Sequence, residues 1–302
     1  MNFPLPPFWK LADTNSWISY QDCLDRFPAD VAASEFATND SGDAVCWILN
    51  QILAGNSFSL SAQIGNSNRF QFAVYGSSLD VNQARLPELL LDNADRWIEQ
   101  ILKSPSRIEF STSGTGGAPK ISEHTIESLA RGLKFGEAQS QSRWGTGFPV
   151  DHFAGMQVLL QAVLNRNPVV DFTNCSAEIA RRELNCETLT HFSATPTFYR
   201  LLLSEPFRVN SMQRVVVGGE RLTPSLLAAL KRAFPNARIR NVYASTELGA
   251  FCPATMTRLL CLLKNRTRSR FPMVSCLFEN RAMASKCGTV PGTRRSDQSG
   301  TT

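Results

Sequence analysis

The sequence lacks the features that mark zinc-binding, disulfide-rich and membrane-spanning proteins. Its eight cysteines form no CxxC pair and no Cys/His ligand spacing, which argues against a structural zinc site. A disulfide framework is not expected, because the chain is long and begins with no convincing secretion signal. The longest apolar stretch, Ala44 to Ala54, is interrupted by Asn50 and Gln51 and is too short to cross a bilayer. We therefore expect reduced thiols, no membrane span and a cytoplasmic location.

Charged residues are also scarce, at 19 % of the chain, and the net charge of +5 is unevenly distributed. From Phe251 to Thr302 there are nine Lys/Arg and two Asp/Glu, a balance of +7. The preceding residues hold 22 basic and 24 acidic side chains, a balance of −2. The basic segment has no clustered stacking aromatics and no recognisable module, so we expect no nucleic-acid partner. Hydrophobic residues, at 43 %, are sufficient for a sizeable core.

Strand and helix patterns alternate between about residues 105 and 250. This alternation predicts an α/β fold, in which mostly parallel sheets are covered by helices. The expected strands are Phe70–Tyr75, Arg107–Ser111, Pro168–Phe172, Leu189–Ala194, Arg214–Val217 and Arg238–Tyr243. The expected helices are Ala44–Leu53, Asn93–Leu102, Glu123–Glu137, Gly155–Leu164, Ala177–Leu184, Thr197–Leu203 and a helix from Thr223-Pro224 to about Phe234.

Three segments follow from this pattern. Residues 1–104 form a short and irregular N-terminal subdomain, and residues 105–250 form the core. Residues 251–302 form an aberrant basic tail that does not continue the α/β rhythm and is expected to be poorly ordered. A frameshift would produce such a tail.

The stretch from Thr112 to Lys120, TSGTGGAPK, has the composition of a phosphate-binding loop. Its glycines allow backbone N–H groups to approach phosphate oxygens closely, its hydroxyl groups are further donors, and Lys120 adds a positive charge. The stretch is not a Walker A loop, because Lys120 follows proline and precedes isoleucine, so a P-loop NTPase is a poor alternative. A flexible surface turn is the other alternative. The predicted phosphate ligands are Thr112, Ser113, Gly114, Thr115, Gly116, Gly117 and Lys120.

The same stretch resembles the phosphate-loop signature of the adenylate-forming superfamily, which comprises acyl-CoA ligases, luciferases and the adenylation domains of peptide synthetases. That signature is T-S-G-T-T-G-x-P-K, and Gly116 replaces its second threonine. The replacement removes one hydroxyl and loosens the loop. The resemblance implies the fold of the large N-terminal domain of these enzymes.

Two further segments resemble signatures of this superfamily in the expected order. The stretch Phe148 to Gly155, FPVDHFAG, resembles P-x-x-H-x-x-G, in which the histidine, here His152, lines the acyl pocket. A lone histidine without such a role is the alternative. The stretch Val215 to Leu222, VVVGGERL, resembles the segment that flanks the adenine, and it contributes Gly218, Gly219 and Glu220.

The last matching segment, Asn241 to Glu247, resembles N-x-Y-G-x-T-E. The resemblance implies that Tyr243 stacks on adenine, Thr246 meets the α-phosphate and Glu247 binds Mg²⁺, with Asn241, Ala244 and Ser245 beside the nucleotide. Ala244 replaces the glycine of the signature and also borders the acyl pocket. If this position requires a positive φ, alanine costs about 1 kcal/mol.

The chemistry implied by the resemblance is activation of a small carboxylic acid by ATP and Mg²⁺ to an acyl adenylate and pyrophosphate. Thr115, Lys120 and Glu247 are the expected catalytic residues. Transfer to the thiol of CoA or of a carrier phosphopantetheine would follow. No Y-x-T-G-D-like stretch follows Glu247, and we expect the C-terminal lid domain with its lysine to be absent. The chain's own activity is therefore doubtful unless a separate lid protein acts in trans. The alternative is a non-catalytic nucleotide- or acyl-binding module, or a decayed fragment.

Overall fold

The computed structural model describes residues 7–14, 16–26, 35–61, 70–76, 94–112, 120–134, 137–186, 188–245 and 249–254. All of them belong to one compact unit, Met1–Met256. The rest of the expected basic tail, from residue 255 onward, is outside this description. Among the helices described, none is long and apolar enough to cross a membrane.

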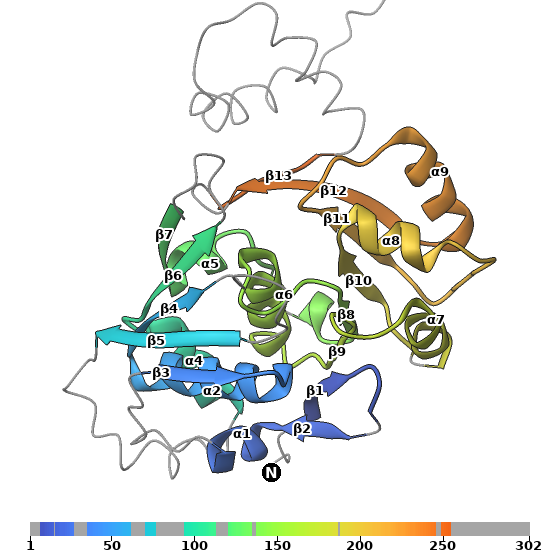
Figure 1. The fold of residues 1–302 in the computed structure, drawn as a ribbon. Helices are drawn as coiled ribbons and strands as arrows, with labels where there is room; N and C mark the ends of the chain where they lie inside the picture. Colours follow the sequence, from blue (N-terminus) through green and yellow to red (C-terminus); the bar gives the residue numbers. More distant parts are fainter. Residues whose placement is uncertain are drawn as a thin grey trace, which may run out of the picture. The chain divides into compact units, whose positions relative to one another are not determined.

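An eight-stranded sheet, sheet A, forms the larger half of the described fold (Figure 1). Its order is β13-β12-β11-β10-β8-β9-β1-β2, and every neighbouring pair from β12 to β1 is parallel. The antiparallel strands β2 and β13 close its two ends. The bounds are β1 Pro7–Leu11, β2 Trp17–Ser19, β8 Trp144–Thr146, β9 Val169–Asp171, β10 His191–Ala194, β11 Arg214–Gly218, β12 Arg238–Ser245 and β13 Gly249–Ala254.

A second, five-stranded sheet, sheet B, has the order β3-β5-β4-β6-β7. Only its β4–β6 pair is parallel. The bounds are β3 Glu35–Thr38, β4 Ser57–Ser61, β5 Phe70–Gly76, β6 Arg107–Thr112 and β7 Lys120–Thr125.

Helices cover both faces of sheet A. The helices are α1 Tyr20–Arg26, α2 Ser41–Ala54, α4 Ala94–Lys103, α5 Ile126–Ala130, α6 Phe153–Val163, α7 Ala177–Cys186, α8 Pro196–Leu202 and α9 Pro224–Ala233. One hydrophobic cluster joins α2 and α6 to strands of both sheets, and another joins α7, α8 and α9 to sheet A alone. Val169 and Val170, which are neighbours in β9, belong to different clusters because successive strand residues face opposite sides. Figure 1 shows α6 between the two sheets and α7 to α9 on the other side of sheet A.

The predicted α/β class with helices covering the sheets is therefore confirmed, and most predicted elements of the core lie within two residues of their expected bounds. The predicted helix start at Thr223 is confirmed in detail: its hydroxyl accepts a hydrogen bond from the backbone N–H of Leu226, and Pro224 is the first helical residue. The capping threonine and the proline are both local signals, so the sequence alone indicates this boundary.

One predicted helix, Glu123–Glu137, is wrong over much of its length. Residues Lys120–Thr125 form β7, which pairs antiparallel with β6 from Thr112↔Lys120 to Arg107↔Thr125. Burial alternates at Ser122 and His124, as expected of a strand with one covered face. The helix begins only after Thr125, whose hydroxyl accepts a hydrogen bond from Ser128 N–H. Tertiary pairing with β6 overrides the helical pattern of the sequence.

Candidate functional site

The carboxyl ends of the parallel strands of sheet A form one edge, which we call the strand-end edge. The register places Thr146 of β8 opposite Ser193 of β10, Ala194 opposite Val217 of β11, and Gly218 opposite Val242 of β12. The loops that follow these strands therefore emerge side by side. Ligands of open parallel sheets bind at such an edge, so it is the first place to look for a site.

The Gly218-Gly219 pair ends the buried strand β11 at this edge. A Cβ built on Gly218 would lie 3.6 Å from Cζ of Phe148 and 3.5 Å from the carbonyl oxygen of Val242. Gly219 has a φ of +80°, and a Cβ there would lie 3.8 Å from Cε1 of Phe148 and 3.6 Å from Cγ2 of Thr195. The bare glycine backbone is thus bordered by one aromatic ring, by strand β12 and by the loop after β10. A planar base could lie against such a surface.

Glu220 is the third predicted site residue of the segment Val215–Leu222, and its side chain contacts α8. Its Oε2 accepts a hydrogen bond from the hydroxyl of Thr197 at 2.7 Å, and the Arg200 guanidinium lies 3.5 Å from the same oxygen. Both partners belong to α8, so Glu220 links the loop after β11 to that helix. The residue that follows the glycine pair is therefore tied to α8.

Asn241 is buried on β12, where it is paired with Val217. Tyr243, Ala244 and Ser245 continue the same strand, and Ala244 pairs with Ala250 of β13. Among the described non-glycine residues, only Arg166 has a positive φ. Ala244 therefore does not have a positive φ, and the backbone cost that alanine would have at such a φ does not apply. Thr246 and Glu247 are not among the described residues.

The predicted phosphate loop lies between β6 and β7 in the sequence. Its two ends, Thr112 and Lys120, are paired across the hairpin, and Lys120 is exposed. The structure describes neither the side chain of Thr112 nor any atom of Ser113, Gly114, Thr115, Gly116, Gly117 and the two residues that follow them.

Ring contacts join this hairpin to the start of α6. The ring centroid of Phe153 lies 5.8 Å from that of Phe110 in β6 and 5.1 Å from that of His124 in β7. Phe153 is the first residue of α6 and directly follows His152. The hairpin that holds the predicted phosphate loop therefore packs beside the predicted pocket histidine.

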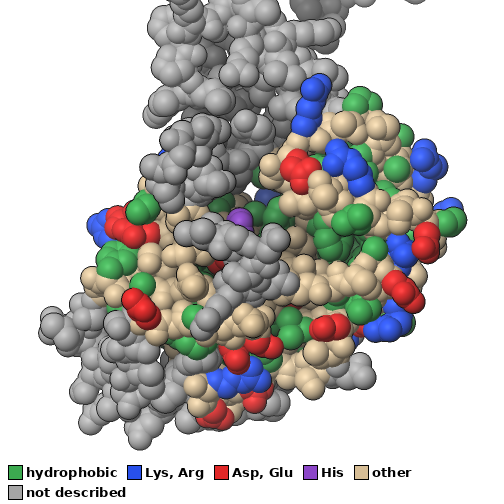
Figure 2. Space-filling view, viewed as in Figure 1, with side chains coloured by type: hydrophobic (Ala, Val, Ile, Leu, Met, Phe, Trp, Pro, Cys, Tyr) green, Lys and Arg blue, Asp and Glu red, His purple; other side chains and the backbone are tan. Residues whose placement is uncertain are grey.

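His152 occupies the N-cap position of α6, and its side chain makes no capping hydrogen bond. Its Nδ1 lies 2.9 Å from Oδ1 of Asp151. The side chain of His152 is 51 % exposed, whereas that of Asp151 is fully buried. The hydrogen bond with Asp151 raises the pKa of His152, and its burial opposes this rise. Figure 2 shows one histidine side chain, without identifying it, on the face that it draws. By exposure, His152 differs from His124 and His191, which are both buried.

Three residues of this site carry no role in the sequence prediction. Phe148 and Asp151 lie inside the segment that supplied His152, and Thr195 caps α8 through a hydrogen bond from Phe198 N–H. The Thr195-Pro196 pair is a helix-start signal, so the sequence could have placed Thr195 at the edge. No sequence signal indicates that Phe148 contacts Gly218, which lies 70 residues later.

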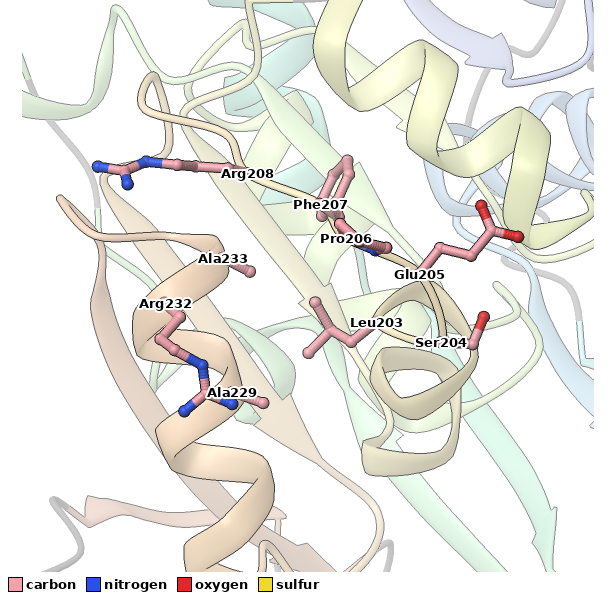
Figure 3. A pocket seen from close by; sticks show the side chains of 9 residues that line it. All are labelled: Leu203, Ser204, Glu205, Pro206, Phe207, Arg208, Ala229, Arg232 and Ala233. Atoms are coloured by element: carbon pink, nitrogen blue, oxygen red, sulfur yellow. The ribbon is translucent and has the colours of Figure 1, made fainter.

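A surface cavity of about 670 Å³ lies away from these residues, between the end of α8 and α9 (Figure 3). No residue that lines it is a predicted site residue. It lies at the ends of α8 and α9, whereas the strand-end edge precedes the beginnings of these helices. This cavity is therefore separate from the strand-end edge. The cavity is lined by Leu203, Ser204, Glu205, Pro206, Phe207, Arg208, Ala229, Arg232 and Ala233.

Within the described part of the chain, no three His, Cys, Asp or Glu side chains gather as a metal site. Glu247, the predicted Mg²⁺ ligand, is not among these described residues.

Comparison with known proteins identifies several relatives of this chain. A family model described as AMP-binding enzyme matches residues 110–281, more than half of the 302 residues. A 2-succinylbenzoate–CoA ligase of Staphylococcus epidermidis is 28 % identical over 174 residues, which are 55 % of this chain and 35 % of the ligase. A plipastatin synthase polypeptide of Bacillus subtilis is 30 % identical over 165 residues, which are 51 % of this chain and 6 % of that polypeptide. The chain thus matches about a third of the length of the ligase.

Two solved structures are similar to this fold. The luciferase-like enzyme of the mealworm Zophobas morio is 14 % identical with a TM-score of 0.50, covering 84 % of this chain and 73 % of the enzyme. This likeness supports the fold alone. The o-succinylbenzoate coenzyme A synthetase of Bacillus subtilis, solved in complex with ATP and magnesium ion, is 24 % identical with a TM-score of 0.42, covering 50 % of this chain and 33 % of the synthetase.

Proposed function

Because this chain belongs to the AMP-binding enzyme family, we propose that it activates a carboxylic acid with ATP to form an acyl adenylate and pyrophosphate. The observation that supports the proposal best is the position of the segment Phe148–Phe153. At one end, the Phe148 ring borders Gly218 and Gly219, and at the other, Phe153 packs on the β6–β7 hairpin. The segment with one signature thus borders the glycine pair of a second signature and packs on the hairpin whose strands flank a third.

The predicted site residues surround the nucleotide from its adenine to its phosphates. Adenine lies against Gly218-Gly219 and stacks on Tyr243, with Glu220, Asn241, Ala244 and Ser245 around it. The phosphates are held by the backbone and hydroxyls of the loop that begins at Thr112, by Lys120 and by Thr246. Glu247 holds Mg²⁺, which would neutralise phosphate charge when bound. His152 and Ala244 border the acid.

The reaction has two steps, and each step forms one bond and breaks one bond. A carboxylate oxygen of the acid attacks the α-phosphorus, the bond from that phosphorus to the bridging oxygen breaks, and pyrophosphate leaves with the electron pair. Attack of a thiolate on the acyl carbon then releases AMP and leaves a thioester. Donors that Thr115 and Lys120 aim at the phosphates stabilise the charge that develops during the first step.

The acceptor thiol is proposed from the relatives. One relative is named as a CoA ligase and another as part of plipastatin synthase, so CoA and a carrier-bound phosphopantetheine are both candidates. Activity with a separate lid protein or an acyl carrier protein belongs to the same proposal. The cysteines Cys23, Cys46, Cys175 and Cys186 are free thiols, which fits a reducing compartment such as the cytoplasm.

Calorimetric titration with ATP and Mg²⁺ tests the nucleotide site first. We expect saturable binding in the wild type and a loss of roughly tenfold or more in affinity for Lys120→Gln, because hydrogen bonds to charged groups contribute about 1.5–3 kcal/mol. Lys103→Gln is the matched control, since Lys103 is an exposed helix residue that pairs with Glu99 four residues before it. Glu247→Gln should weaken the Mg²⁺ dependence of binding.

Acid-dependent exchange of pyrophosphate into ATP then tests the chemistry, over a panel of aryl and alkyl acids and with and without an added lid protein. Exchange supports the proposed reaction. Saturable ATP binding without exchange under any of these conditions would instead identify a non-catalytic nucleotide-binding module. Absence of ATP binding would refute both.

A further inference from the structure

Asp151 and His152 form a pair of unequal exposure at the strand-end edge. The Asp151 side chain is fully buried, and the His152 side chain is half-exposed. Nδ1 of His152 lies 2.9 Å from Oδ1 of Asp151, whereas Oδ2 of Asp151 has no hydrogen-bond partner among the described residues. One buried carboxylate therefore contacts the ring of the residue that borders the proposed acid site.

A buried carboxylate is unfavourable unless a positive charge or several hydrogen-bond donors compensate for lost hydration. Asp151 has one such contact, and its second oxygen has none among the described residues. A protonated imidazole is then the natural counter-charge. An ionised carboxylate only accepts hydrogen bonds, so the proton on Nδ1 must point at Asp151. This arrangement directs Nε2 away from Asp151.

We propose that Asp151 is the positioning residue for His152: it fixes the ring through Nδ1, keeps both ring nitrogens protonated, and leaves Nε2–H to hold the carboxylate of the acid. The inference rests on the proposed function for the identity of the acid. It requires no new chemistry, because no covalent bond changes at either residue. An acid that is about to attack phosphorus is already ionised, and a cationic donor orients it without removing a proton.

The other groups around His152 act less directly. His124 of β7 packs on Phe153, the next residue, and Lys120 begins the same strand. The positive end of α6 disfavours a positive ring at its N-cap. Among the described residues, the direct contact with Asp151 opposes this effect and accounts for the raised pKa of His152.

His191 provides a contrast within the same chain. Its Nδ1 lies 2.8 Å from the hydroxyl of Thr190, a neutral group, and it is buried beside Arg214. Burial, followed by Arg214, lowers the pKa of His191 to about 4. The two histidines therefore differ in the charge of their neighbours, and a titration should separate them clearly.

Nitrogen-detected NMR of the imidazole rings in the full chain tests the proposal, since there are only three histidines to assign. We expect His152 to titrate above 6.5 in the wild type and to carry its remaining proton on Nδ1 once neutral. Asp151→Asn keeps a hydrogen-bond acceptor without the charge, so it should lower the pKa of His152 while preserving the Nδ1–H form. Asp151→Ala removes the acceptor as well as the charge, so it should lower the pKa of His152 and also abolish the preference for the Nδ1–H form. An unchanged His152 titration in both variants would overturn the proposal.

Asp171→Asn is the matched control. Asp171 is another buried carboxylate at the end of a sheet A strand, and its oxygens accept hydrogen bonds from Ser41 and Thr173. Its replacement should leave the His152 titration as in the wild type. If Asp151→Asn fails to fold, His152→Gln provides a second test, because it removes the positive charge opposite Asp151. His152→Gln should lower the free energy of unfolding of the wild type. It should lower that of any Asp151 variant that folds by a smaller amount.

The role toward the acid is tested in the exchange assay with whichever acid of the panel supports exchange. Asp151→Asn should raise the KM for that acid about tenfold near neutral pH, with a smaller change in kcat. An unchanged KM would exclude the contact with the acid. If no acid supports exchange, the proposed function fails, whereas the NMR titration still decides whether Asp151 positions His152.

Discussion

Gly155, in the first turn of α6, lies directly against the carbonyl group of Pro149. A Cβ built on Gly155 would collide with the carbonyl oxygen of Pro149 and would lie 3.0 Å from that of Phe148. Both atoms are backbone atoms, so neither can move aside as a flexible side chain would. The close approach fixes the loop that contains Asp151 and His152 against the start of the helix. It gives a physical reason for glycine at the end of the segment FPVDHFAG.

Gly155→Ala should therefore destabilise the fold and displace the loop. Overpacking against backbone typically costs about 1–3 kcal/mol, and we expect the upper part of this range. The free energy of unfolding from urea denaturation measures it. Gly132→Ala is the control, because Gly132 is exposed and a Cβ there would have no neighbour within 4 Å. Equal effects of the two substitutions would contradict the close approach.

The two glycines after β11 should respond differently to alanine. A Cβ on Gly218 would make only ordinary contacts at 3.5 Å or more, so Gly218→Ala should leave stability nearly unchanged. If the adenine lies against this backbone, the same methyl group should reduce ATP affinity by roughly tenfold, about 1.4 kcal/mol. Gly219→Ala should instead destabilise the protein by about 1 kcal/mol, because Gly219 has a positive φ. Calorimetry and urea denaturation of both variants separate these effects.

Stability should depend on pH through His191. Its pKa is lowered to about 4 in the folded protein by burial, with a further contribution from Arg214. Between about 4 and 6.5 the unfolded chain binds a proton that the folded protein does not, so stability falls as pH decreases through this window. The shift corresponds to at most about 3 kcal/mol. Between pH 6.5 and pH 4, the free energy of unfolding of His191→Gln should fall less than that of the wild type. Parallel curves of unfolding free energy against pH would show that His191 is not the cause.

The cap of α9 gives a prediction that does not depend on function. The Thr223 hydroxyl accepts a hydrogen bond from the N–H of Leu226 at 3.3 Å. Thr223→Ala should lower the free energy of unfolding by about 1 kcal/mol, whereas Thr223→Ser retains the acceptor and should remain close to the wild type. Chemical denaturation of the three proteins gives the comparison. A serine variant as unstable as the alanine variant would show that the hydroxyl does not act as a cap.

The sequence by itself determined the elements whose signals are local. The buried strand Arg214–Gly218, the capped helix after Thr223 and the α/β alternation follow from apolar runs, caps and glycines within a few residues of each other. The sequence also indicated which segments belong to the proposed site, because glycines, hydroxyls and the Phe148–Gly155 segment form recognisable patterns. These are properties of short stretches of chain.

Only the tertiary structure decided which distant residues meet. Residues Lys120–Thr125 became β7 because β6 offers a partner, which a local helical pattern does not reveal. β1, near the N-terminus, lies beside β9, about 160 residues later, and Phe148 borders Gly218. The pairing of Asp151 with His152 depends on side-chain direction at the start of α6. Such contacts arise from packing and strand order, which depend on the whole chain, and so they are not contained in any single segment.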